Sequence, residues 1–196
     1  MHILILGYSN LFRRRILNVL LENNIKFSIA SKSSKEKEKK ACKWYTNYFT
    51  ALHNSEANIV YISLANSHHY YWAKRALEKG YHVIVDKPLS KNYLQTKKLI
   101  SFARKKKKLI AEATFFNYHK QFLKTLKSIK SINHINYINT NFIIPTPKKN
   151  SFRIKKDFGG GCLSDMGPYA AATARLLGNG KILNLNSNIF KNKNGL

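Results

Sequence analysis

Acidic side chains are scarce in this sequence: nine Asp and Glu stand against 35 Lys and Arg, a formal net charge of +26. Such an excess would suit a polyanionic partner, because Lys and Arg release counterions when they bind nucleic acid. The lysines, however, are spread along nearly every expected helix, as in 32–43 and 91–108, and a biased coding composition would produce the same spread. A nucleic-acid-binding protein is therefore the less favoured alternative, and we interpret the run Arg104–Lys108 as a solvated helix end.

Cysteines and long apolar runs are also missing. The two cysteines, Cys42 and Cys162, lie far apart, which excludes a disulfide framework and a paired-cysteine metal site. His68, His69 and His119 have no cysteine or acidic cluster near them, so we expect no metal. With no run of about 18 apolar residues and no charged leader, we expect a soluble cytoplasmic protein without membrane contacts.

Short apolar runs alternate with helical patterns in the first half of the chain. The runs predict buried strands at Ile3–Leu6, Phe27–Ala30, Ile59–Ser63, His82–Val85 and Leu109–Ala113. Apolar spacings of three and four predict helices at Phe12–Leu21, Lys35–Tyr48, His68–Lys79 and Lys91–Arg104, with Ser67 and Ser90 as N-caps and Gly80 as a stop. This alternation predicts an α/β fold with a Rossmann-type, doubly wound parallel sheet.

The rhythm changes near residue 115. A helix is expected at Gln121–Ile129, an extended segment at His134–Ile144, a helix from Gly161 to Leu177 and a strand at Ile182–Asn188. We therefore expect residues 1–115 to form an NAD(P)-binding domain, and residues 116–196 to begin an α+β substrate or oligomerisation domain. This second domain looks incomplete because it has too few strands for a typical sheet, and its open edge suggests a homo-oligomer.

The first strand leads into Gly7-Tyr8-Ser9-Asn10-Leu11-Phe12, where a dinucleotide fold places its phosphate-binding turn. Only the first glycine of the G-x-G-x-x-G pattern is present, and Ser9 and Phe12 occupy the other two glycine positions. We expect Gly7, Ser9, Asn10 and Leu11 to bind the cofactor, with the Ser9 hydroxyl near a phosphate. An ordinary strand-to-helix turn is the alternative.

The acid that usually follows the second strand and binds a ribose 2′-hydroxyl is absent. Ser31-Lys32-Ser33 stands in its place. Hydroxyl groups and a cation suit a 2′-phosphate, so Ser31 and Lys32 are predicted to favour NADP over NAD.

Two later segments, 60–69 and 82–90, resemble the Gfo/Idh/MocA family, named after glucose-fructose oxidoreductase and inositol dehydrogenase. Members typically carry Pro-Asn-x-x-His after the third sheet strand and Glu-Lys-Pro after the next. This chain has Ala65 and Asp86 in place of the proline and glutamate and keeps the other motif residues, Asn66, His69, Lys87 and Pro88. The resemblance implies that the cofactor contacts Ser63, Leu64, Asn66, His69, Asp86 and Lys87.

The segments 111–119 and 159–169 also resemble the family, with Asn117 and Lys120 as departures. The resemblance implies that Lys87 is the catalytic acid or base, that Asp165 orients the substrate hydroxyl and that Tyr169 donates or relays a proton. Without it, Asp165 would be an acid favoured early in a helix, and Tyr169 a core aromatic residue.

The function implied is an NAD(P)-dependent oxidoreductase that transfers a hydride between nicotinamide and a hydroxyl or carbonyl carbon of a sugar or sugar derivative. The opening Gly7-Tyr8-Ser9 resembles a subgroup linked to surface-sugar synthesis. The alternative is a non-catalytic, shortened dinucleotide-binding remnant, because the glycine loop is degraded and the chain is short.

Overall fold

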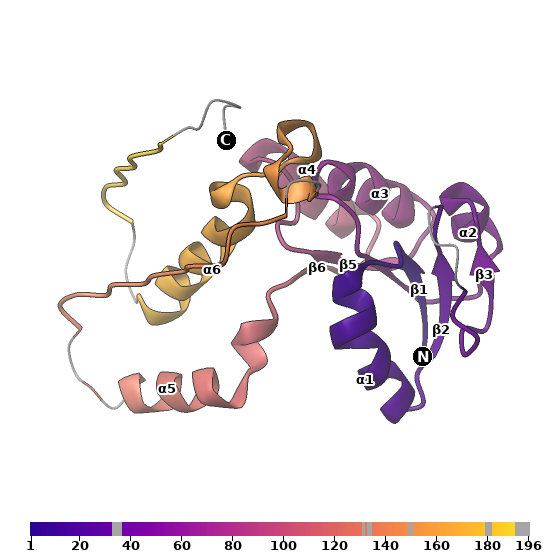
Figure 1. Ribbon diagram of the computed structural model, residues 1–196, viewed down its shortest axis with the longest axis horizontal. Coiled ribbons are helices and arrows are strands. Elements are labelled where there is room, and N and C mark those ends of the chain that lie inside the picture. Colours follow the sequence, from indigo (N-terminus) through magenta and orange to yellow (C-terminus); the bar gives the residue numbers. More distant parts are fainter. Residues whose placement is uncertain (33–36, 131, 133–134, 149–150, 179–181, 191–196) are drawn as a thin grey trace. The chain divides into compact units, whose positions relative to one another are not determined.

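The computed structural model describes residues 1–32, 37–130, 132, 135–148, 151–178 and 182–190. The chain divides into two compact units, Met1–Ala113 and Thr114–Leu196 (Figure 1).

The first unit is built on a six-stranded sheet in which all strand pairs are parallel. The strand order is β3-β2-β1-β4-β5-β6, and the direction of winding reverses between β1 and β4. This is the doubly wound Rossmann order, so the fold expected from the alternating pattern is confirmed. The strands are β1 (His2–Leu6), β2 (Lys26–Ala30), β3 (Trp44–Tyr45), β4 (Ile59–Ile62), β5 (His82–Asp86) and β6 (Ile110–Ala113).

Helices cover both faces of this sheet (Figure 1). The helical elements are η1 (Phe12–Ile16), α1 (Leu17–Glu22), α2 (Tyr48–Asn54), α3 (Asn66–Glu78) and α4 (Tyr93–Lys105). Alternate β1 side chains face opposite cores: Ile3 and Ile5 pack with residues of η1 and α1, whereas Leu4 and Leu6 pack with residues of α2, α3 and α4. Burial on both faces explains why the strands are continuous apolar runs.

The helix expected at Lys35–Tyr48 is wrong where the structure describes it. The segment after residue 36 follows β2 instead: Cys42 N–H donates to Phe27 O at 2.8 Å, and Ile29 N–H donates to Lys43 O at 2.9 Å. β3 follows, and the next helix begins only at Tyr48, because the Asn47 side chain caps it. Apolar residues at three- and four-residue spacing predicted a helix, but pairing with the edge of β2 decided the local structure.

Two expected helix caps are also wrong. Ser67 lies inside α3, whose N-cap is Ala65. The α4 N-cap is Asn92, whose side chain accepts from Gln95 N–H at 3.0 Å, while Ser90 instead bonds to Thr96. The expected stop at Gly80 is confirmed, with a φ of +84° that suits glycine.

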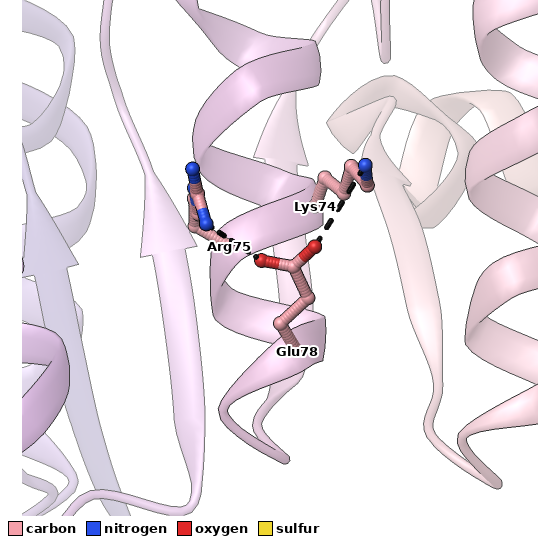
Figure 2. A network of polar contacts seen from close by, with 3 residues as sticks. All are labelled: Lys74, Arg75 and Glu78. Atoms are coloured by element: carbon pink, nitrogen blue, oxygen red, sulfur yellow. Dashed lines mark hydrogen bonds and ion pairs between the residues drawn. The ribbon is translucent and has the colours of Figure 1, made fainter.

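The outer face of α3 carries a small network of charges (Figure 2). Glu78 lies 3.2 Å from Arg75 and 3.8 Å from Lys74, at spacings of three and four residues. Exposed pairs of this kind contribute little to stability, because solvent screens their charges. The network therefore supports the helix locally, while the fold depends on the two apolar cores.

The basic run Arg104–Lys108 lies at the end of α4, as expected. Arg104 and Lys105 form the last turn, and residues 104–107 are exposed. The Lys106 ammonium lies 5.7 Å from the centre of the Phe102 ring, so its stem covers apolar surface. The run thus has a local structural role that requires no polyanion.

The second unit is helical where the structure describes it. Its helices are η2 (Phe115–Tyr118), α5 (Lys120–Lys130), η3 (Phe152–Ile154), η4 (Lys156–Phe158) and α6 (Cys162–Leu177). The helices expected near α5 and α6 are confirmed. The strand expected at Ile182–Asn188 is wrong, and the described residues of 134–144 form no strand either, because no described neighbour in this unit pairs with them. Within the part of the chain that is described, no helix is long and apolar enough to cross a membrane.

Candidate active site at the carboxyl edge of the sheet

Gly7 passes close to the backbone of Ser63 at the carboxyl edge of the sheet. It follows β1, and its N–H donates to Ala30 O at 2.9 Å. Its φ is +99°, and a Cβ atom added there would lie 2.2 Å from the carbonyl oxygen of Ser63. Only glycine fits this turn, which is the property that a dinucleotide loop requires at its first glycine.

Ser9 and Phe12 occupy the other two glycine positions in different ways. The Ser9 hydroxyl accepts from Phe12 N–H at 3.0 Å and lies 2.6 Å from the Ser63 hydroxyl. The Phe12 ring is fully buried, and η1, which it begins, has π-helical geometry. Asn10 and Leu11 are exposed, and Asn10 accepts a hydrogen bond from Arg13. The turn is therefore held by side-chain contacts at positions where the family pattern has glycine.

Asp86 ends β5 and is buried, at 9% exposure. The register pairs Ile62 with Val85, which brings Ser63 beside Asp86. Ser63 donates to Asp86 Oδ2 at 2.7 Å, and the Tyr61 hydroxyl donates to Oδ1. Burial raises the pKa of Asp86, although the hydrogen bonds from Tyr61 and Ser63 act against that rise. Burial, followed by the Asp86 charge, raises the pKa of Tyr61 far above its usual value.

His69 connects two loops at this edge. Its ring is fully buried, with Nδ1 at 2.7 Å from Pro88 O and Nε2 at 3.0 Å from Leu64 O. Leu64 follows β4, and Pro88 follows Lys87 after β5, through a cis peptide bond. His69 therefore fixes the loop that carries Lys87 against the loop that follows β4.

Glu112 holds the Lys87 segment from the other side. It belongs to β6, and its Oε2 accepts from Leu89 N–H at 2.7 Å. Lys87 itself is partly buried at the end of β5. The motifs in the sequence did not indicate a role for Glu112 or Tyr61. The sequence signal for each was a polar side chain within an expected strand. Tyr61 stands two residues before Ser63, and Glu112 stands in the segment 111–119 that resembles the family.

Lys32 and Ser31 lie beyond the end of β2. Ser31 is buried, and its N–H donates to Tyr45 O at 2.9 Å. Lys32 is exposed, with its ammonium 5.2 Å from the centre of the Tyr48 ring. Tyr48 packs edge-on against Trp72, at 5.0 Å between ring centres, and burial raises its pKa. The packed ring gives Lys32 a defined place while its charge stays in solvent.

In the second unit, Asp165 is buried near the start of α6. Its Oδ2 lies 3.3 Å from Arg153 Nε. The glycines that precede it wrap around the Arg153 carbonyl: Gly161 N–H donates to that oxygen at 2.8 Å, and a Cβ on Gly160 would lie 2.5 Å from it. Glycine is therefore required at 160 so that the backbone can pass Arg153, which orients the start of the helix.

Tyr169 lies one turn after Asp165 on α6. Its ring stacks on Phe142, at 5.7 Å and an interplanar angle of 20°, and lies 5.8 Å from Phe116. Asp165 and Tyr169 thus share one unit, whereas Lys87 belongs to the other. The catalytic roles of these three residues stay predictions.

Stability at this edge should depend on the Asp86 charge. Since its pKa is raised in the folded state, the folded chain binds a proton more readily than the unfolded chain. As pH rises from the ordinary pKa of 3.8 to the raised pKa of the folded state, the free energy of unfolding therefore falls. At higher pH the free energy of unfolding stays lower by the amount lost. Asp86→Asn, which resembles the neutral acid, is expected to stabilise the protein at pH 8, with a smaller difference at pH 4.5.

Calorimetric melts of both proteins at the two pH values measure this difference. Glu22→Gln, at an exposed acid in α1, is the matched control and should show no such pH dependence. A variant that is less stable than the wild type at pH 8 would contradict the assigned cost of the buried charge.

Sequence comparisons agree with the class of protein that this fold and edge define, a Rossmann dinucleotide-binding protein. The Gfo/Idh/MocA family, described as an oxidoreductase family with an NAD-binding Rossmann fold, matches residues 1–114, more than half of the chain. The chain belongs to this family.

Two of the curated relatives are named for reactions on sugars. A dTDP-3,4-didehydro-2,6-dideoxy-alpha-D-glucose 3-reductase of Streptomyces violaceoruber is 30% identical over 76% of this chain and 46% of its own length. An NADP(+) D-xylose 1-dehydrogenase of Haloferax volcanii is 28% identical over 67% of this chain and 41% of its own length. The chain thus spans about half the length of the curated relatives that it matches.

A solved structure has a similar fold. KijD10, a 3-ketoreductase from Actinomadura kijaniata in complex with NADP and TDP-benzene, superposes with a TM-score of 0.83 at 28% identity. The match covers 90% of this chain and 57% of KijD10. The likeness therefore extends beyond the first unit.

Proposed function

We propose that this chain is the nucleotide-binding part, with adjoining substrate elements, of an NADP-dependent oxidoreductase that acts on a hydroxyl or carbonyl carbon of a sugar or sugar derivative. The main support for this proposal is the carboxyl edge of the sheet, where Gly7, Ser63, Asp86 and Lys87 lie together. The chain also belongs to a family of oxidoreductases. The clash of a Cβ at Gly7 supports the proposal, because a dinucleotide loop needs a glycine at this turn. Sugar-nucleotide reductases among the relatives support a substrate of that class.

Lys87 is the proposed acid or base. When bound, NADPH would supply a hydride to a carbonyl carbon, or oxidised NADP would accept one from a carbinol carbon, and the sugar oxygen would gain or lose a proton in the same step. The Lys87 ammonium would donate that proton to a carbonyl oxygen, or its amine would accept one from a hydroxyl. His69 and Glu112 hold the flanking backbone on both sides, so the loop that carries the ammonium is fixed before substrate arrives.

Asp165 and Tyr169 complete the proposed chemistry within the second unit. The Asp165 carboxylate would accept from a sugar hydroxyl while Arg153 holds its other side. The Tyr169 hydroxyl would donate or relay a proton, and the Phe142 and Phe116 rings limit the motion of its ring.

Oxidation of NADPH in the presence of a panel of free and nucleotide-linked keto sugars tests the activity. Saturable turnover with one sugar class supports the proposal, whereas cofactor binding without turnover across the panel favours a non-catalytic dinucleotide-binding chain.

Cofactor preference should depend on Lys32. A cation and the Ser31 hydroxyl after β2 suit a 2′-phosphate, and two relatives are named or solved with NADP. Lys32→Ala is expected to weaken NADPH binding about tenfold, the scale of one charge-assisted hydrogen bond, and to leave NADH binding unchanged. Fluorescence titration measures both. Lys79→Ala, at an exposed lysine after α3, is the control for net charge. Equal weakening of both cofactors would contradict this role.

The proposal also places the protein in the cytoplasm, because its two cysteines are free and exposed, which suits a reducing compartment.

Self-association is a further prediction for this chain. Sedimentation velocity of the full chain tests it, and a monomer at all concentrations would count against it.

A further inference from the structure

Ser9 stands where the dinucleotide pattern has its second glycine, and its hydroxyl group has two short contacts. It lies 3.0 Å from Phe12 N and 2.6 Å from Ser63 Oγ. Ser63, which is 2% exposed, lies 2.7 Å from Asp86 Oδ2. Three side chains are thus joined in series: Ser9 in the loop after β1, Ser63 directly after β4 and Asp86 at the end of β5.

The direction of each hydrogen bond follows from the carboxylate. An ionised Asp86 can only accept, so the single Ser63 proton points to Asp86. The Ser63 oxygen must then accept from Ser9, and the Ser9 oxygen accepts from Phe12 N–H. The protons therefore run in one order, from Phe12 N–H through Ser9 and Ser63 to Asp86, and neither hydroxyl proton is left for a phosphate.

The loop rests on Ser63 through its backbone as well. Gly7 passes so close to the Ser63 carbonyl that a Cβ would lie 2.2 Å from it. Tyr61 occupies the second Asp86 oxygen, which fixes the carboxylate in its plane. A buried charge that is held in this way can orient a chain of hydroxyls strongly, because local dipoles are poorly screened there.

We infer that Asp86, through Ser63 and Ser9, holds the phosphate-binding turn in the conformation that receives the diphosphate of NADP, in place of the missing second glycine. This inference rests on the proposed cofactor binding. Ser9 and Ser63 are then positioning residues, and the residue next to Lys87 also sets the shape of the cofactor loop.

A double-mutant cycle tests this inference on the full chain, with NADPH fluorescence titration as the readout. Ser63→Ala and Ser9→Ala are each expected to raise the NADPH Kd about five- to tenfold. In the Ser9→Ala background, Ser63→Ala is expected to change the Kd no further, because the chain is already cut. Losses that simply multiply in the double variant, or a Ser63→Ala protein that binds like the wild type, would overturn the inference.

Two comparisons separate positioning from general loss of structure. Ser9→Thr keeps the hydroxyl and is expected to bind within about twofold of the wild type, so equal weakening in the Thr and Ala variants would count against the hydroxyl. Ser28→Ala is the matched control. Ser28 lies on β2, and its buried hydroxyl is 2.9 Å from His2 Nε2. Loss of this hydroxyl should leave the NADPH Kd unchanged. Thermal melts report folding of each variant. Failure of the wild type to bind NADPH would instead refute the proposed function.

Discussion

Lys87→Ala is expected to lower kcat by about 10²- to 10⁴-fold, the usual contribution of a positioned acid or base. The NADPH Kd should change by less than about threefold, because the cofactor turn is held by Gly7, Ser9 and Ser63. Steady-state assays with the sugar that gives turnover, together with fluorescence titration, separate the two quantities.

Lys91→Ala is the matched control for this experiment. Lys91 is exposed and follows the same loop, and its backbone N–H donates to Gln95 Oε1. It should retain the wild-type kcat. Turnover that survives in Lys87→Ala, or equal loss of NADPH binding and turnover, would contradict a catalytic role for Lys87.

Gly7→Ala is expected to abolish measurable NADPH binding, with a rise in Kd of about a hundredfold or more, and to destabilise the first unit by about 3 kcal/mol or more. The new methyl group would have to adopt a φ of +99° and would lie 2.2 Å from the Ser63 carbonyl oxygen. The backbone must therefore move away from β4, and the turn is lost. Titration and thermal melts measure both effects.

Gly80→Ala provides the control for backbone strain alone. Gly80 has a similar φ of +84°, but the nearest atom to an added Cβ is Lys108 Cε, at 3.9 Å. We expect a loss of only about 1 kcal/mol and no change in NADPH affinity. Normal NADPH binding by Gly7→Ala would show that the turn is not the phosphate site.

Most of the first unit could be predicted because its strands are buried on both faces. Short apolar runs such as Ile3–Leu6 are typical of strands buried on both faces of a sheet. The helices between these runs connect one strand to the next as parallel neighbours. The segment 37–45 could not be predicted in this way. Its backbone pairs with β2, which lies more than ten residues earlier in the chain, and the local spacing of apolar residues does not specify that pairing.

The candidate site was predictable where strand ends carry motif residues. Gly7, Ser63, Asp86 and Lys87 all follow or end strands, and parallel strands bring their carboxyl ends to one edge. The partner of Asp86 was not predictable, because Tyr61 lies in a strand that reads as apolar. Likewise, the pairing of Asp165 with Arg153 depends on how the glycines fold back, which the sequence pattern does not specify.

The most direct test of the central claim is fluorescence titration of the purified chain with NADPH and with NADH at low and high salt. Saturable binding that prefers NADPH by about tenfold and survives the higher salt would agree with a built Rossmann site, since a diphosphate held by backbone N–H groups is less screened than one held by surface charge alone. No binding, or equal binding of both cofactors that collapses with salt, would contradict the claim and leave the net charge of +26 as the source of any affinity.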